Sequence, residues 1–193
     1  MDLTQGTVQQ KNARAKKMML LFLMVALTMS FAAWTSAYIV SSSRPDWLSE
    51  FALPNIFFIS TGVLLMSSIT FHLVKTAIKA NKRGLASILL LLTLMLGITF
   101  IRLQFVGFQE IIDAGYYFTG PGSSITMSYV YVITAVHIVH VIAGLIVLLV
   151  VTINHFRGKY KPGQTLGLEL GVMFWHFLDV LWVYLFLFLY FFR

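Results

Sequence analysis

Five long apolar stretches, separated by short polar segments, make up most of this chain. A helix needs roughly 20 mainly apolar residues to cross a bilayer, and each stretch reaches that length. The pattern therefore predicts an all-α fold, a polytopic membrane helix bundle with five transmembrane helices. We place the spans at residues 18–40, 55–76, 85–113, 125–152 and 165–193.

Basic residues are unevenly distributed between the two ends of these spans. Eleven Lys and Arg side chains lie beside the N-terminus and after the second and fourth spans, against two on the opposite side, Arg44 and Arg193. Because cytoplasmic segments are enriched in Lys and Arg, we expect the N-terminus in the cytoplasm and the C-terminus outside. Residues 1–17 are predicted to be a polar, basic, mobile cytoplasmic tail, and residues 18–193 a single transmembrane domain.

A basic start followed by an apolar run is also the form of a secretory signal peptide. The run over residues 18–40 is longer than the usual apolar core of about 7–15 residues, and Trp34 and Tyr38 occupy the place of a small-residue cleavage site. We therefore expect the first span to be retained.

The composition agrees with a membrane protein and excludes several other classes. Charged residues make up 11% of the chain, against about 25% in a typical soluble domain, and the mean hydropathy is +0.84. The absence of cysteine excludes disulfides and thiolate metal sites. A net charge of +7 would suggest nucleic acid in a soluble protein, but its placement here indicates membrane orientation, so no nucleic-acid partner is expected.

The last span carries a polar stripe inside its apolar run. Glu169, His176 and Asp179 are spaced by seven and three positions, which returns them to one face of a helix. An ionisable side chain in hydrocarbon costs at least ~2.5 kcal/mol, so this stripe is expected to face other protein. The fourth span contributes two further candidates, His137 and His140, on the helix that precedes it.

Three uses of these groups stay open from the residues alone. In the first, a histidine of the fourth span donates to Asp179 and fixes the helix register. In the second, His137, His140 or His176 holds a haem, or a metal together with Glu169 and Asp179; His72 is placed nearer the cytoplasmic end, away from that group. In the third, the carboxylates form a path for a proton or an ion.

The other polar groups in the spans are expected to serve packing. Arg102 can reach Asp179 across the bundle or extend toward Glu110 at the outer interface. Gly144 is interpreted as a close helix contact, and the hydroxyls of the second span can bond their own backbone or a neighbouring helix. We predict these structural buried polar residues: His137, His140, Glu169, His176, Asp179, Arg102 and Gln104.

Together these motifs resemble subunit III of the haem–copper oxidases. Residues 167–169 (Gly-Leu-Glu) and 175–182 (Trp-His-Phe-Leu-Asp-Val-Leu-Trp) match the family's block on its last helix. Residues 137–141 (His-Ile-Val-His-Val), followed by Gly144, resemble its His-x-x-His-Val-x-x-Gly motif. The resemblance covers about residues 20–193 and implies a short five-helix form of a seven-helix bundle.

The resemblance implies a non-catalytic subunit of a respiratory terminal oxidase in the bacterial inner membrane, such as an aa3-type cytochrome c oxidase. Its expected partners are subunits I and II, which carry the haem and copper, with membrane phospholipids and other respiratory subunits as further contacts. No cofactor is expected in this chain. Its implied role is to stabilise subunit I and sustain proton uptake. A related subunit of a nitric oxide reductase system and a b-type membrane cytochrome are the alternatives.

One departure from the family lies in the first span. The family has a buried glutamate there, whereas residues 18–40 contain no Asp or Glu, and Leu27 or a neighbour occupies that level. A role of that acid in proton handling is therefore not carried over to this chain.

Overall fold

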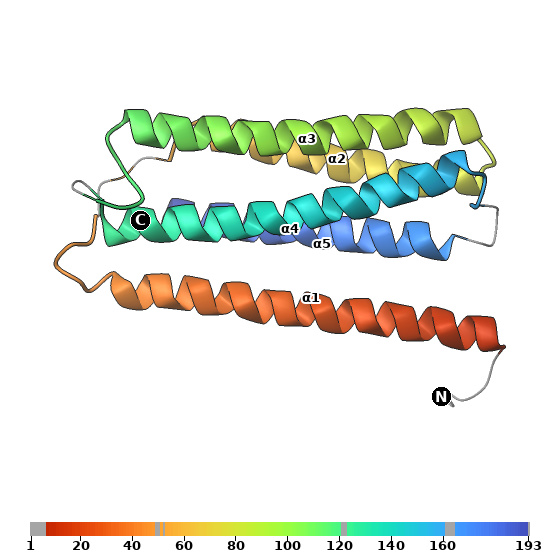
Figure 1. Cartoon of the computed structure of the whole chain (residues 1–193), viewed down its shortest axis with the longest axis horizontal. Coiled ribbons are helices and arrows are strands. Elements are labelled where there is room, and N and C mark those ends of the chain that lie inside the picture. Colours follow the sequence, from red (N-terminus) through yellow and green to blue (C-terminus); the bar gives the residue numbers. More distant parts are fainter. Residues whose placement is uncertain (1–6, 49–50, 52, 121–122, 161–164, 193) are drawn as a thin grey trace.

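The computed structural model describes residues 7–48, 51, 53–120, 123–160 and 165–192, and five helices account for most of them (Figure 1). All five are long and apolar enough to cross a membrane, which confirms the predicted all-α class and the number of spans. The helices are α1 (Val8–Ser41), α2 (Ile56–Lys79), α3 (Arg83–Asp113), α4 (Ile125–Phe156) and α5 (Leu166–Phe191).

The first helix begins well before the predicted span. Thr7 and Gln10 form a capping box, in which the Thr7 side chain accepts from the Gln10 amide at 3.3 Å and the Gln10 side chain accepts from the Thr7 amide at 3.2 Å. The basic residues that follow are good helix formers. Residues 8–17, which the sequence assigned to a polar tail, are therefore helical and extend α1 beyond its apolar part.

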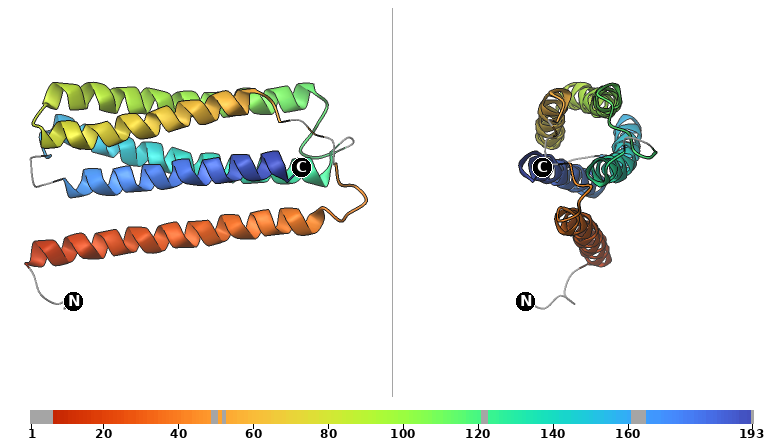
Figure 2. Two further views of the ribbon diagram at one scale, coloured as in Figure 1. Left: turned by 180° about the vertical axis from the view of Figure 1, so that it is seen from behind. Right: turned by 90° about the vertical axis from the view of Figure 1, so that its left-hand side faces the viewer.

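The five helices are not equally embedded in the bundle. Helices α2, α3, α4 and α5 surround one core, and α1 lies along the outside of α4 and α5 (Figure 2). Of the most apolar window of each helix, 61% is buried in α5 but only 17% in α1. Helix α5 therefore organises the packing, while most of α1 is left for contacts outside this chain.

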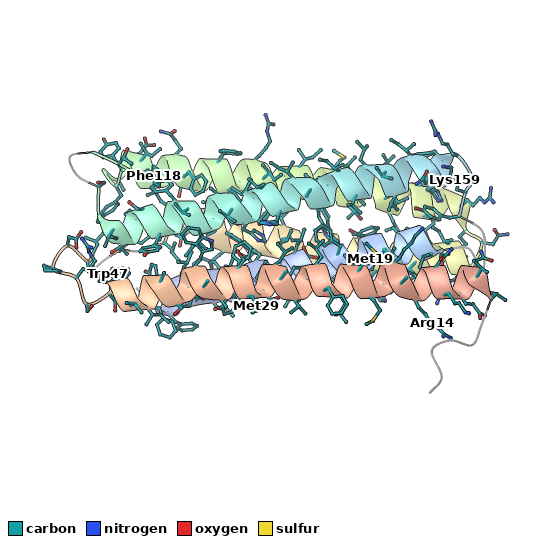
Figure 3. All side chains as sticks on the ribbon, turned by 60° about the horizontal axis from the view of Figure 1, so that its bottom comes forward. Arg14, Met19, Met29, Trp47, Phe118 and Lys159 are labelled. Carbon is teal, nitrogen blue, oxygen red and sulfur yellow. The ribbon has the colours of Figure 1, made fainter. Side chains whose placement is uncertain are left out.

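The two ends of the bundle differ in chemistry. Arg14 and Lys159 lie near one end, and Trp47 and Phe118 lie near the other (Figure 3). Tryptophan and tyrosine favour the membrane interface, where an apolar ring can keep a polar tip in contact with water. The basic end and the aromatic end thus have the asymmetry expected of an oriented membrane protein.

Glycines set the closest helix contacts. A Cβ at Gly97 of α3 would lie 2.8 Å from the Trp175 ring, and a Cβ at Gly144 of α4 would lie 2.7 Å from the Leu178 side chain. Neither glycine could carry a side chain without displacing a neighbour on α5. The prediction that Gly144 marks a close helix contact is confirmed.

Candidate functional site

The polar groups of the spans gather along the second helix, where hydroxyls link it to its neighbours. The Ser67 hydroxyl donates to the Leu64 carbonyl at 2.7 Å and accepts from the Trp175 indole N–H at 3.1 Å. The Ser60 hydroxyl donates to the Phe57 carbonyl at 2.9 Å and accepts from the Gln104 amide at 3.0 Å. Each hydroxyl thus satisfies its own proton locally and offers its oxygen to another helix.

The same arrangement recurs on both sides of these two links. The Thr61 hydroxyl donates to the Phe57 carbonyl at 2.7 Å and accepts from the Trp182 indole at 3.0 Å. The Thr70 and Thr93 hydroxyls lie 2.9 Å apart across α2 and α3. The hydroxyls were expected to bond their own backbone or a neighbouring helix, and in the structure these four do both, which fixes the register of α2 against α3 and α5.

Asp179 occupies the middle of α5 and is almost completely buried. Its carboxylate oxygens have no hydrogen-bond partner among the described residues, and Oδ2 lies 3.9 Å from Nδ1 of His176 on the same helix. The His176 Nδ1 is 2.5 Å from the Ser68 hydroxyl of α2. A serine and an imidazole therefore stand beside a carboxylate that they do not saturate.

His72 belongs to this group, contrary to the expectation from the sequence. Its ring centroid lies 5.8 Å from that of His176, across α2 and α5. The sequence pattern placed His72 far from the other histidines. In the structure His72 follows Ser68 by one helical turn, so both side chains lie on the same side of α2, the side that faces His176. Ser68, His72, His176 and Asp179 form what we call the α2/α5 polar seam.

The predicted pairing between a histidine of α4 and Asp179 is not formed. Both ring nitrogens of His137 lack a hydrogen-bond partner among the described residues, and the ring stacks on Trp182 with centroids 5.1 Å apart. His140 is half-buried and its Nδ1 donates to the Val136 carbonyl of its own helix at 2.7 Å. The expectation was wrong because the Trp182 ring, one turn from Asp179, occupies the place facing His137.

Glu169 lies at the start of α5, away from the seam. Its carboxylate accepts from the Lys17 ammonium at 2.8 Å and from the Thr165 hydroxyl at 3.1 Å. Both charged side chains are partly exposed, at 44% for Lys17 and 26% for Glu169. This ion pair joins α1 to α5. Lys17 and Glu169 both lie at the basic end of their spans, and this shared position in the sequence pattern could have suggested the pair.

Arg102 differs from its prediction. It is exposed on the outside of α3, and among the described residues it has no hydrogen bond or ion pair, with Asp179 or with Glu110. Gln104 is fully buried, as predicted, and it stands two positions away, which turns Arg102 to the opposite side of the helix. The expectation that Arg102 is buried within this chain is therefore wrong.

The geometry gives little support to a cofactor held by the α4 histidines. The rings of Phe31 and Phe100 approach His137 edge-on, with centroids at 6.2 Å and 6.3 Å, and Trp182 covers its face. Among the described residues, no group of three or more His, Asp or Glu side chains is arranged to hold a metal ion. The seam and its hydroxyls are suited to joining helices.

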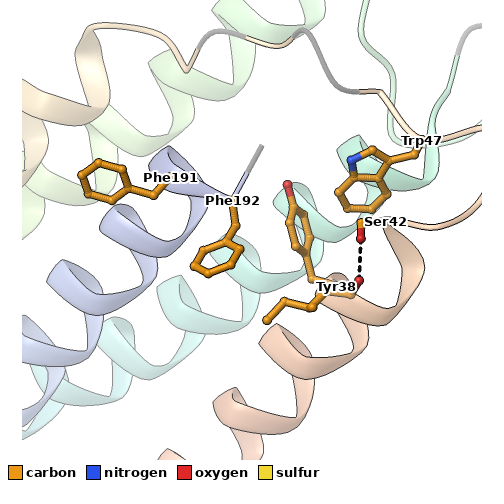
Figure 4. Close-up of a pocket in the computed structure, with 6 residues that line it drawn as sticks. Tyr38, Ser42, Trp47, Phe191 and Phe192 are labelled. Atoms are coloured by element: carbon orange, nitrogen blue, oxygen red, sulfur yellow. Dashed lines mark hydrogen bonds between the residues drawn. The ribbon is translucent and has the colours of Figure 1, made fainter.

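A separate pocket of about 240 Å³ lies at the aromatic end, between the ends of α1 and α5 (Figure 4). Tyr38 and Trp47 form one wall and Phe191 and Phe192 the other. Ser42 also lines it, but its hydroxyl donates to the Ile39 carbonyl at 2.7 Å. The pocket therefore presents aromatic surface at the level of the membrane interface and no reactive group.

Comparison with known proteins places these motifs in a family. A family model described as cytochrome c oxidase subunit III matches residues 4–193. Cytochrome bo(3) ubiquinol oxidase subunit 3 of Buchnera aphidicola is 35% identical over 141 residues, which cover 70% of this chain and 69% of that protein. The protein of the same name from Pseudomonas aeruginosa is 31% identical over 161 residues, with 81% and 75% covered. Cytochrome c oxidase subunit 3 of Spodoptera frugiperda is 30% identical over 149 residues, with 76% and 95% covered.

Proposed function

Because this chain belongs to the family of cytochrome c oxidase subunit III, a subunit of the haem–copper oxidases, we propose that it is the non-catalytic subunit that stabilises subunit I of an aa3-type oxidase. It sustains proton uptake by subunit I, where oxygen is reduced. Haem and copper belong to subunits I and II in this family. The chain's own contribution is therefore a rigid membrane surface against which the catalytic subunit is held.

The observation that carries this proposal is the use of the polar groups in the spans. Trp175 packs against Gly97 and donates to Ser67, so one side chain of α5 joins α2 and α3. Gln104 and Trp182 are held by hydroxyls of α2 in the same way. Side chains that lock helices to one another belong to a scaffold, and this use accounts for the family's most specific motif.

The proposed orientation places the N-terminus in the cytoplasm and the C-terminus outside. The basic end of the bundle, with Arg14 and Lys159, then faces the cytoplasm (Figure 3). The proposed location is the plasma membrane of a bacterium, where membrane phospholipids would cover the exposed apolar sides of α1 and α3.

Purification of the complex through a tag on this chain tests the proposal. Subunits I and II should co-purify, and their haem spectrum should be present, while the chain expressed alone should show no Soret band. Deletion of the chain should leave an oxidase that starts at normal rate and loses activity during turnover. A Soret band that titrates with the isolated chain would support a b-type cytochrome instead, and co-purification with a nitric oxide reductase would support the other alternative.

A further inference from the structure

The α2/α5 polar seam differs from the other polar contacts of the bundle because it reaches the surface. The links from Trp175, Trp182 and Gln104 to α2 are buried or partly buried inside the bundle. In the seam, His72 is exposed and the His176 side chain is 32% exposed, within the spanning parts of their helices. Two adjacent imidazoles thus lie on the outside of a membrane bundle.

Lipid is a poor neighbour for such groups. Hydrocarbon offers no hydrogen bond, so an imidazole that faces lipid leaves its ring nitrogens unsatisfied, which is unfavourable. The His176 Nδ1 is engaged by Ser68, which leaves its Nε2 free to bond a further group, while His72 forms no hydrogen bond with any residue that the structure describes. Asp179 behind them adds two oxygens without a partner among the described residues.

In the part of the chain that the structure describes, the charged groups nearest the seam form no hydrogen bond or ion pair with it. Glu169, on the same helix as His176, is paired with Lys17 of α1 and hydrogen-bonded to Thr165. Lys75, one turn from His72 on α2, lies on the side of Glu169, toward the basic end. Among the described residues, no side chain supplies a hydrogen bond to the exposed His72 ring or to Nε2 of His176, so we expect these bonds to come from outside this chain.

Apolar side chains frame the two imidazoles on both helices. Ile69 and Leu65 of α2 precede His72 by about one and two turns, respectively, and are exposed. Met173 and Val180 of α5 precede and follow His176 by one turn and are exposed as well. This combination of an apolar border and a polar centre is what a transmembrane helix carrying one polar side chain would fit.

We propose that the α2/α5 polar seam is the docking surface for a transmembrane helix of a neighbouring oxidase subunit, which places a hydrogen-bonding side chain against His72 and His176. The inference rests on the proposed function, because it names the face through which this chain joins the complex. Lipid chains and a second copy of this chain are the competing occupants.

The absence of cysteine from the chain allows a direct test by single-cysteine labelling. Val180→Cys reports on the seam, and Met95→Cys on the outer face of α3 is its matched control, since the two side chains are 69% and 67% exposed. Each variant is treated with a membrane-permeable maleimide in the intact purified complex and again after dissociation into subunits.

We expect Val180→Cys to label at least about tenfold more slowly than Met95→Cys in the intact complex, because a covered side chain reacts only when the interface opens. The two should label at similar rates after dissociation, and a thiol-to-amine crosslinker on Val180→Cys should join this chain to another subunit. His72→Phe, which keeps an aromatic ring beside His176 but removes its two nitrogens, should weaken retention of the chain during detergent washing several-fold, whereas Thr99→Val on α3 should not.

Each opposite outcome overturns the inference. Equal labelling of the two cysteines in the intact complex would mean that lipid covers the seam. A disulfide between two Val180→Cys chains would mean that a second copy covers it. Subunits I and II would be present in both of those cases, whereas their absence from the purified material would overturn the proposed function itself.

Discussion

At the scale of single residues, tryptophan is the side chain that joins the bundle. A buried indole brings a large apolar ring and one N–H that needs an acceptor. Trp175 finds that acceptor in Ser67, and Trp182 finds it in Thr61, both on α2. The two residues are therefore fixed in orientation as well as in depth, which an all-apolar side chain of the same size would not achieve.

Trp175→Phe should destabilise the chain by about 1–3 kcal/mol, since it removes a hydrogen bond worth ~0.6–1.7 kcal/mol in a membrane protein and leaves a small void. The measurement is thermal unfolding of the detergent-solubilised complex, followed through this subunit. Trp34→Phe is the control, because Trp34 is only partly buried and sits at the edge of a small cluster with α4 and α5. Equal effects of the two substitutions would contradict the role assigned to the Ser67 bond.

The pH response of the loop between α1 and α2 has a clear sign. Arg44 donates to Asp46 at 2.9 Å, and this hydrogen bond lowers the pKa of the Asp46 carboxyl. A lowered pKa means that the pair's contribution is complete above the ordinary pKa of ~3.9 and is lost as pH falls through the lower folded value. Amide exchange of residues 44–47 should therefore be the same in wild type at pH 7 and pH 5, once corrected for intrinsic rates. A loss of protection already at pH 5 would contradict it.

At the scale of elements, each helix is held by a different kind of contact. Helix α5 is fixed by large side chains against glycines of α3 and α4, whereas α1 is held by the buried rings of Phe31 and Tyr38 and by a few separated polar links. These are the Lys17–Glu169 ion pair, the Thr35–Tyr184 hydroxyl contact at 3.0 Å and the Ser41–Tyr129 bond at 3.1 Å. Helix α1 should therefore separate from the bundle before the other four separate from one another.

Gly97→Ala should destabilise the bundle by about 1–3 kcal/mol, because the added Cβ meets the rigid Trp175 ring at 2.8 Å. The matched control is Gly62→Ala, since Gly62 lies inside α2 with no atom within 4 Å of its added Cβ. That control should be neutral or stabilising by up to ~1 kcal/mol, from helix propensity alone. Unfolding of both variants in the same detergent decides the comparison, and equal destabilisation would show that Gly97 is not a packing position.

Lys17→Ala should loosen the N-terminal half of α1 with little effect on global stability, because a partly exposed ion pair contributes only about 0–1 kcal/mol. Hydrogen exchange of α1 amides is the measurement, and the loosening should be mimicked by raising the salt concentration, which screens exposed charges. Lys16→Ala provides the control on the neighbouring position. An identical response to both substitutions would mean that total charge, and not the Glu169 contact, holds α1.

At the scale of the whole molecule, the sequence predicted the spans but not the rotation of each helix about its axis. Apolar runs located all five helices, and small residues such as Gly144 identified close contacts. In lipid, apolar side chains occur on every side of a helix, so hydrophobicity alone does not say which face is inside. The outward direction of Arg102 and the approach of His72 to His176 depended on that missing rotation.

The same limit explains why the role of Asp179 could be stated but its partners could not. Asp179 is 2% exposed and its Oδ2 lies 3.9 Å from Nδ1 of His176, and only the rotation of α2 about its axis brings Ser68 to the same place. Asp179→Asn replaces an ionisable carboxyl group with a neutral amide of the same shape. This changes the electrostatics of the seam and leaves the packing of α5 in place.

Asp179→Asn should therefore lower the yield of assembled oxidase or shorten its activity during turnover, while the haem content per assembled complex stays at the wild-type value. Subunit stoichiometry by mass spectrometry and the visible spectrum of the same preparation measure the two quantities independently. His176→Ala should act in the same direction, because it removes the imidazole between Ser68 and Asp179. A variant that assembles fully and loses haem would place redox chemistry in this chain, and would remove the basis for treating its buried acids and imidazoles as contacts between protein surfaces.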